Sequence, residues 1–320
     1  MVLILVFVAT LFLAYSNGAN DNFKGVATLY GSGQMTYKQA INWATLAQIG
    51  GSVTSVFIGA TLVKNFSGKG LIPDSFLTQP VFAIAVALGA AVTVLLATRI
   101  GMPISTTHGL VGALVGAGFV AVGMGLNFSK LGTAFVLPLL VSPLLSAALS
   151  FSLYKLFSMI FKEKTSENSL LDMGHRLTAI VVCFARGLND TPKIVGLLVL
   201  IQALDVRLGM TAVAAAMAIG GWFNAAKVAE TMSKKITPLN NEQGFAANLV
   251  TGILVSTASY SGLPVSTTHV SVGSLFGIGV ATRQAQWSVL KNILLSWLLT
   301  LPIAAAFSGL FYFIFNQFQL

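Results

Sequence analysis

Long stretches without a charged residue constrain this chain most. Eight of them hold 19 to 40 residues each, and their bounds are 1–20, 39–63, 75–98, 100–129, 131–154, 208–226, 243–282 and 292–320. A helix needs about 20 mostly apolar residues to cross the hydrocarbon core of a bilayer. Charged residues make up only 8% of the chain, against about 25% in a soluble domain. The sequence therefore predicts a polytopic integral membrane protein whose surroundings are the lipid bilayer, and it excludes a soluble fold.

The same stretches favour helices over a β-barrel. Barrel strands alternate polar and apolar residues over about 10 positions, whereas these stretches are longer and apolar on all sides. The chain also has 31 glycines, which suit helices that pack closely in lipid. We therefore expect an all-α fold. The lone cysteine, Cys183, argues against a disulfide framework.

The net charge of +9 does not point to nucleic acid. Lys and Arg lie mostly in the polar connectors, as at Lys64, Lys162 and Lys234, where they are typical of topology signals and of contacts with lipid headgroups. The first stretch lacks a basic start and a small-residue cleavage site, so we expect a first membrane span and not a removed signal. The expected location is the cell (plasma or inner) membrane.

Three short motifs occur twice, in the same order. Residues 102–108 and 263–269 agree at five of seven positions, residues 18–24 and 187–193 share Gly, Asn, Asp and Lys in register, and residues 49–51 and 219–221 both read Ile-Gly-Gly. The copies are offset by 161, 169 and 170 residues. Self-similarity of this kind indicates a duplicated transmembrane repeat.

The duplication predicts the organisation of the chain. We expect a first transmembrane repeat over 1–161, a short charged linker over 162–175 and a second transmembrane repeat over 176–320. The first half contains five apolar stretches, and an odd number of crossings would insert the second half in the opposite orientation. We expect two inverted-topology repeats with broken or re-entrant helices and about 10 to 12 membrane segments.

Two acids stand apart from the polar connectors. Asp21 and Asp190 are repeat equivalents, and each follows an asparagine and has apolar sequence around it. A carboxylate at the bilayer centre costs about 2.5 to 3.5 kcal/mol even on the insertion scale. Two such costs at equivalent positions favour an ion site, although a pair of helix caps at the membrane surface is the alternative.

The duplicated hydroxyl motifs predict a site for an anion. Each begins after a proline, which is a helix-start signal, so each is expected to open a short helix. Two helix N-termini that face each other would surround an oxyanion with N–H and O–H donors, while ordinary helix capping is the simpler explanation for either copy. The residues expected to bind a tetrahedral anion are Ser105, Thr106, Thr107, Ser266, Thr267 and Thr268.

An anion beside two carboxylates needs cations between them. Like charges cannot sit close together in a cavity of low dielectric constant, so bound Na+, or protons on the acids, would have to enter with the anion. Hard oxygen atoms nearby suit Na+ better than a soft metal. Asn20 and Asn189 are expected beside the cation with Asp21 and Asp190, and Asn22 and Thr191 beside the anion.

Two histidines and two lysines complete the motifs. His108 and His269 end the hydroxyl motifs, where a proton relay and a neutral, hydrogen-bonded pair of histidines both remain open. Lys24 and Lys193 follow the acids by three residues. They could pair with the acid or contact the anion, but the pattern favours extension of the lysines to the membrane interface.

Together these motifs resemble those of the inorganic phosphate transporter (PiT) family, over nearly the whole chain. The resemblance implies a prokaryotic sodium/phosphate symporter, in which Asp21 and Asp190 coordinate the coupling cation and the six hydroxyls hold inorganic phosphate. It implies no cofactor other than Na+ as the coupling ion. Gln48 and Asn248 stand where some animal members carry membrane glutamates, which leaves the ion stoichiometry open.

The function expected first is Na+-coupled phosphate import by alternating access, with phosphate and cations bound near the bilayer midplane. Symport with H+, symport of a metal-phosphate complex, or sulfate as the substrate are alternatives within the class. An aquaporin-like channel is more remote, because the paired Asn-Pro-Ala signature is absent. A hydrolase is disfavoured because no Gly-x-Ser-x-Gly elbow occurs, so we expect no enzyme. A homodimer is left open.

Overall fold

The computed structural model describes residues 2–160, 169–199 and 205–318, and in these ranges the chain is helical without a strand. The α-helices are α1 (Val2–Asp21), α2 (Ala27–Gly31), α3 (Tyr37–Ile58), α4 (Ala60–Phe66), α5 (Asp74–Leu77), α6 (Pro80–Arg99), α7 (Thr106–Val122), α8 (Phe128–Lys130), α9 (Leu137–Ile160), α10 (Ser169–Val195), α11 (Val206–Asn224), α12 (Ala226–Glu230), α13 (Asn241–Tyr260), α14 (Thr267–Thr282) and α15 (Trp287–Gln317). A 3-10 turn follows α7 (Gly123–Gly125), and π-helical turns precede α9 (Leu131–Val136) and follow α12 (Thr231–Lys235).

Ten of these helices, within the described ranges, have 16 residues or more. Six spans are long and apolar enough to cross a membrane by length and composition, and α3 with α4 forms a seventh that is bent by 88°. Of the remaining long helices, α14 has only 16 residues, and α10 and α13 are less apolar because they carry many polar side chains. The expected all-α polytopic fold is confirmed. Six or seven of the described spans qualify as membrane segments, so the expected number of 10 to 12 stays a prediction.

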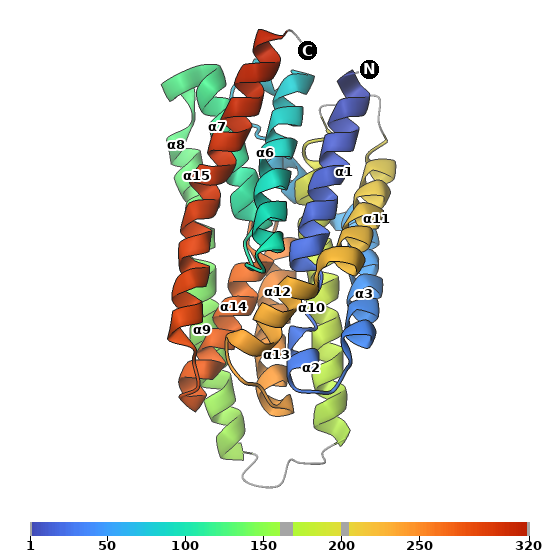
Figure 1. Ribbon diagram of the computed structural model, residues 1–320, viewed down its shortest axis with the longest axis vertical. Coiled ribbons are helices and arrows are strands. Elements are labelled where there is room, and N and C mark those ends of the chain that lie inside the picture. The colour runs from blue at the N-terminus through green and yellow to red at the C-terminus, as the bar shows by residue number, and fades with distance from the viewer. Residues whose placement is uncertain (1, 161–168, 200–204, 319–320) are drawn as a thin grey trace.

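The two halves of the chain run in opposite directions (Figure 1). Helix α1 begins at the top of the view and α9 ends at the bottom, whereas α10 begins at the bottom and α15 ends at the top. The packing partners exchange in the same way: α1 packs against α6 and α11, and its equivalent α10 packs against α13 and α3. The predicted inverted-topology repeats are therefore confirmed.

Each repeat contributes one helical hairpin to the centre. Helix α6 descends from the top of Figure 1 and α7 returns toward it, while α13 and α14 lie in the lower half. The hairpin turns meet, because the hydroxyl of Thr268 donates to the carbonyl of Ile104 at 2.8 Å and that of Thr107 donates to the carbonyl of Val265 at 3.4 Å. The two hairpins therefore meet at their turns in the centre of the molecule.

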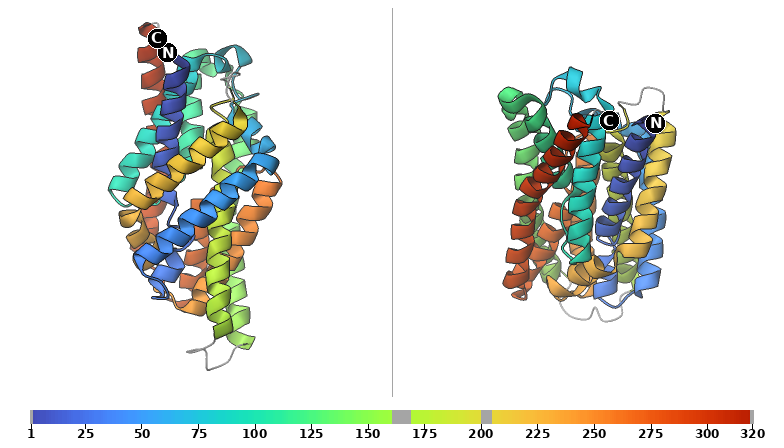
Figure 2. Two further views of the ribbon diagram at one scale, coloured as in Figure 1. Left: turned by 90° about the vertical axis from the view of Figure 1, so that its right-hand side faces the viewer. Right: turned by 45° about the horizontal axis from the view of Figure 1, so that its top comes forward.

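Glycines let the helices approach closely at equivalent places. A Cβ atom on Gly187 would lie 2.1 Å from the carbonyl oxygen of Gln48, so α10 and α3 touch at the backbone there. Gly116 of α7 and Gly277 of α14, which are repeat equivalents, approach the backbones of α15 and α9 in the same manner. Small residues allow this contact in a bilayer, where packing replaces the hydrophobic effect as the driving force. Figure 2 shows α3 and α11 side by side across one flank of the molecule.

The region between the repeats differs in length from the expected linker. Helix α9 ends at Ile160 and α10 begins at Ser169, so residues 169–175 of the expected linker form the first two turns of α10. Residues 161–168 lie outside the described ranges. The division of the chain at 161 and 176 remains a prediction.

Candidate functional site

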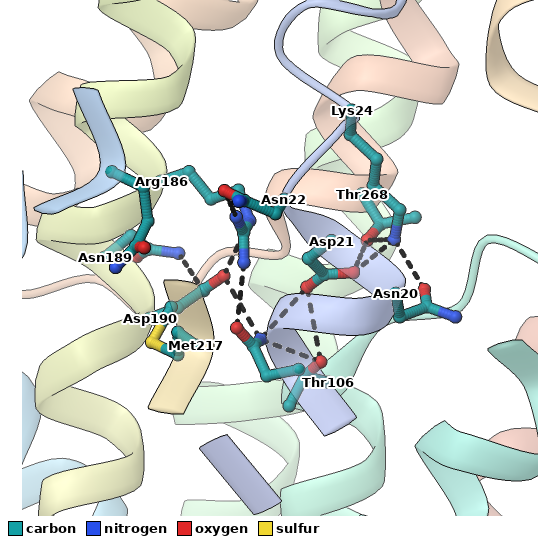
Figure 3. Close-up of polar contacts among 12 residues, drawn as sticks. Asn20, Asp21, Asn22, Lys24, Thr106, Arg186, Asn189, Asp190, Met217 and Thr268 are labelled. Atoms are coloured by element: carbon teal, nitrogen blue, oxygen red, sulfur yellow. Dashed lines mark hydrogen bonds and ion pairs between the residues drawn. The ribbon is translucent and has the colours of Figure 1, made fainter. Parts of the chain in front are cut away.

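Asp21 lies at the last residue of α1 and is buried, with 1% of its surface exposed. Its Oδ1 atom pairs with the ammonium of Lys24. Its Oδ2 atom accepts hydrogen bonds from Asn17 Nδ2 at 3.1 Å and from Thr106 Oγ1 at 3.2 Å (Figure 3). Thr106 is the first residue of α7, so the acid of one broken helix contacts the hairpin of the same repeat.

Asp190 lies within α10 and is similarly buried, at 3% exposed. Its Oδ1 atom accepts from Asn189 Nδ2 at 3.1 Å and lies 3.4 Å from Lys193 Nζ. Its Oδ2 atom lies 3.5 Å from Arg186 Nε and accepts from Asn17 Nδ2 at 3.4 Å. One amide, that of Asn17, therefore donates to both acids, and the structure brings Asp21 and Asp190 into a single polar cluster.

Asn17 and Arg186 belong to the site, and sequence reasoning missed them. Arg186 is buried and donates to Asn17 Oδ1 at 2.8 Å and to Asn22 Oδ1 at 3.0 Å (Figure 3). A usable signal existed, because each residue precedes its acid by four positions, one helical turn, and Arg186 is the only charge between residues 177 and 189.

Lys24 and Lys193 are buried beside the acids, at 3% and 1% exposed. Both form ion pairs, Lys24 with Asp21 and Lys193 with Asp190. The interpretation that they extend to the membrane interface is therefore wrong. A lysine three residues after an acid lies close enough on a helical turn to form an ion pair with it. At low dielectric constant the electrostatic energy of such a close pair is large.

The hydroxyl motifs supply helix caps and contacts to the buried charges. Ser105 and Ser266 cap α7 and α14, because each hydroxyl accepts from the backbone N–H three residues later at 3.1 Å. Each motif does open a helix, but α7 has 17 residues and α14 has 16, so neither is short. The hydroxyls of Thr106, Thr107 and Thr268 contact the buried acids or lysines.

The asparagines beside the acids hold the hairpin turns. Asn20 Nδ2 donates to Thr98 Oγ1 at 2.9 Å and to the Met102 carbonyl at 3.0 Å. In the other repeat, Asn189 Nδ2 donates to the Val265 carbonyl at 3.3 Å, and its Oδ1 atom accepts from Ser259 at 3.2 Å. These bonds join each acid-bearing helix to the turn of its own hairpin.

Asn22 and Thr191, which the sequence predicts beside the anion, both contact α3. Asn22 Nδ2 donates to Thr45 Oγ1 at 2.9 Å, and Thr191 Oγ1 lies 2.7 Å from Ser52 Oγ. Thr191 also donates to Met217 Sδ at 3.6 Å. Asn22 remains joined to the central cluster through Arg186, whereas the contacts of Thr191 lead toward α3 and α11.

The two histidines lie together on the far side of the hairpin helices. Their ring centroids are 4.4 Å apart, and the ring of His269 stacks on Trp297 at 3.8 Å. His269 Nδ1 lies 3.0 Å from the Leu139 carbonyl oxygen, which accepts a hydrogen bond from it. Both rings line a cavity of about 600 Å³ whose other walls are apolar side chains and Trp297. This placement favours the packed histidine pair over a proton relay beside the acids.

Gln48 and Asn248, the neutral amides that the sequence singled out, form hydrogen bonds with hydroxyl groups. Gln48 Nε2 donates to Ser52 Oγ at 2.7 Å, which joins it to Thr191, and Asn248 Nδ2 donates to Thr28 Oγ1 at 2.7 Å. Both side chains are buried. They add no charge to the membrane interior.

The charge balance of the cluster differs from that expected from the sequence. Two carboxylates face three cations, Lys24, Lys193 and Arg186, so the formal charge is +1 when all five groups are ionised. The acids are therefore compensated by the protein itself, and the argument that a bare pair of acids forces cation entry is wrong. Among the described residues, no group of three or more His, Cys, Asp or Glu side chains could hold a metal ion.

Comparison with known proteins agrees with the fold and the duplication. The model of the phosphate transporter family matches residues 17–173 and again residues 160–308. A Bacillus subtilis protein named "Probable low-affinity inorganic phosphate transporter" is 28% identical, with 98% of this chain and 97% of the relative covered. A Rhizobium meliloti protein of the same name is 30% identical, with 95% and 93% covered.

A solved structure described as "The sodium-dependent phosphate transporter" superimposes with a TM-score of 0.88 at 27% identity and covers 99% of both chains. The family match spans both halves of the chain, and the solved structure has the same fold over its whole length. Among the described residues, six or seven helical spans fit a membrane by length and composition. This multi-pass membrane protein therefore belongs to the phosphate transporter family.

Proposed function

We propose that this chain is a secondary active transporter that imports inorganic phosphate across the cell membrane, not an enzyme. The observation that carries the proposal is the buried cluster with a formal charge of +1, at the meeting point of two hairpin turns that bear hydroxyl donors. Arg, Lys and threonine side chains with helix N-termini are the donors that phosphate requires. The names of the relatives support phosphate as the substrate.

The proposed phosphate ligands are drawn from the hairpin turns and the acid-bearing helices. They are Ser105, Thr106, Thr107, Ser266, Thr267, Thr268, Asn22 and Thr191, as the motifs predict, and Arg186 is added to them because its guanidinium lies in the same cluster. Bidentate hydrogen bonding suits Arg186 to a phosphate group. Helix α1 ends near mid-height of the molecule in Figure 1, which supports a binding position close to the bilayer midplane.

The proposed mechanism is alternating access. Asp21, Asp190 and Arg186 are all 3% exposed or less, so a phosphate ion can reach them only after the helices move. The two repeats have opposite orientations and exchange packing partners, so rocking of one repeat against the other opens the cluster to either side in turn.

Na+ is the proposed coupling ion. The name of the solved relative supports it, and the oxygen atoms of Asp21, Asp190, Asn20 and Asn189 are hard ligands that suit Na+. Proton coupling is an alternative, although the positive partner of each acid in the cluster opposes its protonation. Metal-phosphate symport and sulfate as the substrate remain further alternatives, and a homodimer remains a prediction.

Uptake of radiolabelled phosphate into proteoliposomes tests the function. We expect uptake when Na+ is present outside, loss of uptake when choline replaces Na+ at constant pH, and no competition from excess sulfate. Uptake that follows a pH gradient without Na+ would select proton coupling. Absence of phosphate uptake under either gradient, in protein shown to be folded, would contradict the proposed function.

A further inference from the structure

The ammonium of Lys24 lies inside a cluster of four oxygen atoms, which we name the Lys24 cluster. Lys24 Nζ donates to Asn20 Oδ1 at 2.8 Å, the Ile104 carbonyl at 2.9 Å and Thr268 Oγ1 at 2.6 Å, and it pairs with Asp21 Oδ1 (Figure 3). An ammonium group has three protons. Four oxygens at hydrogen-bond distance therefore exceed what lysine can satisfy, but a spherical cation satisfies them all.

The ammonium of Lys193 lies in an equivalent cluster, which we name the Lys193 cluster. Lys193 Nζ donates to the Val265 carbonyl at 2.6 Å and to Thr107 Oγ1 at 2.9 Å, and it lies 3.4 Å from Asp190 Oδ1. Val265 and Ile104 are repeat equivalents, as are Thr107 and Thr268. Each lysine thus contacts its own acid, its own hairpin carbonyl and a hydroxyl of the opposite repeat.

These donor sets are those of a hard monovalent cation. One carboxylate, one backbone carbonyl and one hydroxyl are common to both clusters, and the Lys24 cluster adds an amide oxygen. Oxygen ligands of this kind, including carbonyls of unwound backbone at broken helices, bind Na+ in transporters. Each lysine follows its acid by three residues, so its ammonium group is covalently tethered to the chain next to these oxygen atoms.

We propose that Lys24 and Lys193 are tethered occupants of two cation sites, and that a coupling Na+ binds only by displacing the lysine ammonium. This inference rests on the proposed transport function. The ammonium groups keep the buried acids compensated in the ion-free protein, where an unpaired charge would be strongly destabilising. A displaced lysine is then free to donate to the phosphate that enters with Na+.

The two clusters predict an order of displacement. Lys24 has four oxygen partners and a close pair with Asp21, whereas Lys193 has three and lies 3.4 Å from Asp190. Lys193 is held less tightly, so the first Na+ replaces Lys193 and the second replaces Lys24. Na+ binding to the wild type is weak because it competes with an attached cation.

The test uses the purified full-length chain in detergent, without phosphate. Thermal unfolding is measured in NaCl and in choline chloride, together with binding of radiolabelled Na+. In Lys24→Met the cluster keeps its oxygens but loses its cation, so the Na+ concentration for half-maximal stabilisation falls about tenfold or more. Lys38→Met removes an exposed lysine of α3 and serves as the matched control with a wild-type response.

The double variant Lys24→Met with Asp21→Asn separates cation binding from a general loss of packing. It removes both charges, so Na+ no longer stabilises the protein through this cluster. Equal Na+ responses in the wild type, Lys24→Met and the double variant would overturn the proposal.

If Lys24→Met does not fold, the same measurements are made on variants of the Lys193 cluster. Lys193→Met and its double variant with Asp190→Asn give the same comparison. If both lysine variants stay unfolded in NaCl while both double variants fold, Na+ cannot replace the ammonium and the proposal fails. Phosphate uptake by the wild type is measured separately. If the lysine variants bind Na+ more tightly than the wild type but the wild type takes up no phosphate, the transport function is contradicted and the two cation sites are supported.

Discussion

Arg186 donates a hydrogen bond at 2.8 Å to the side-chain oxygen of Asn17, the residue at the equivalent position of the other repeat. Both precede the acid of their repeat by one helical turn, so the duplicated chain places an arginine opposite an amide at its centre. This is the point where the symmetry of the site is broken. The cluster gains its net positive charge from this one difference.

Replacement of Arg186 by Gln is expected to abolish most phosphate uptake. The change removes the excess positive charge and the bonds to Asn17 and Asn22. Removal of one partner of a buried ion pair destabilises a protein by about 3 to 5 kcal/mol, and the remaining pair of Asp190 with Lys193 keeps the loss at the lower end of that range. Uptake in proteoliposomes and thermal unfolding measure the two effects. Arg176→Gln, at an exposed position of the same helix, should behave as wild type; equal losses in both variants would contradict the assigned role.

Asp21→Asn and Asp190→Asn are each expected to abolish Na+-dependent uptake. Asp21 accepts from Asn17 and Thr106 and pairs with Lys24, so the amide leaves Lys24 without its counter-charge. The phosphate uptake assay in Na+ and in choline measures the result. A variant that folds and transports with an unchanged Na+ dependence would exclude that acid from coupling.

Thr107→Val and Thr268→Val should each lower the free energy of unfolding by a similar amount. Each hydroxyl accepts a hydrogen bond from the lysine of the opposite repeat, at 2.9 Å for Thr107 and 2.6 Å for Thr268. Hydrogen bonds to charged groups contribute about 1.5 to 3 kcal/mol, and valine preserves the shape of the side chain. Thermal unfolding measures the loss, with Thr133→Val, an exposed site, as the control. Unchanged thermal unfolding in both variants would contradict the contacts described for the two lysines.

Gly187→Ala is expected to disrupt folding. The added Cβ atom would lie 2.1 Å from the Gln48 carbonyl oxygen. This clash can be relieved only if the backbones of α3 and α10 move apart. The yield of monodisperse protein and its unfolding temperature measure the effect. Gly132→Ala is the matched control, since no atom lies within 4 Å of its added Cβ. Normal yield of Gly187→Ala would mean that α3 and α10 are farther apart than described.

His108→Phe should retain phosphate uptake within about twofold, because an aromatic ring of similar shape fills the space that the imidazole occupies beside the apolar cavity. Uptake is compared at several pH values in both proteins. A variant whose uptake loses its dependence on pH would restore the proton-relay interpretation.

The sequence predicted the elements that repeat and missed those that depend on tertiary contacts. Identical motifs identified Asp21, Asp190 and the hydroxyls, because two copies of a costly feature are easily recognised. The direction of Lys24 could not be predicted in this way, since its spacing from Asp21 allows both an ion pair and extension to the interface. The spacing of Asn17 from Asp21 marks it only weakly, because its role arises from contacts 89 and 173 residues away in the chain.

The exchange of hydroxyls between the repeats has a consequence for the history of the chain. Lys24 takes a ligand from the second repeat and Lys193 takes one from the first. One repeat alone could build neither cluster, and two identical units would have to associate in opposite orientations about a two-fold axis to build both. A substitution at Thr107 in the first repeat therefore acts on Lys193 in the second, and one at Thr268 acts on Lys24 in the first.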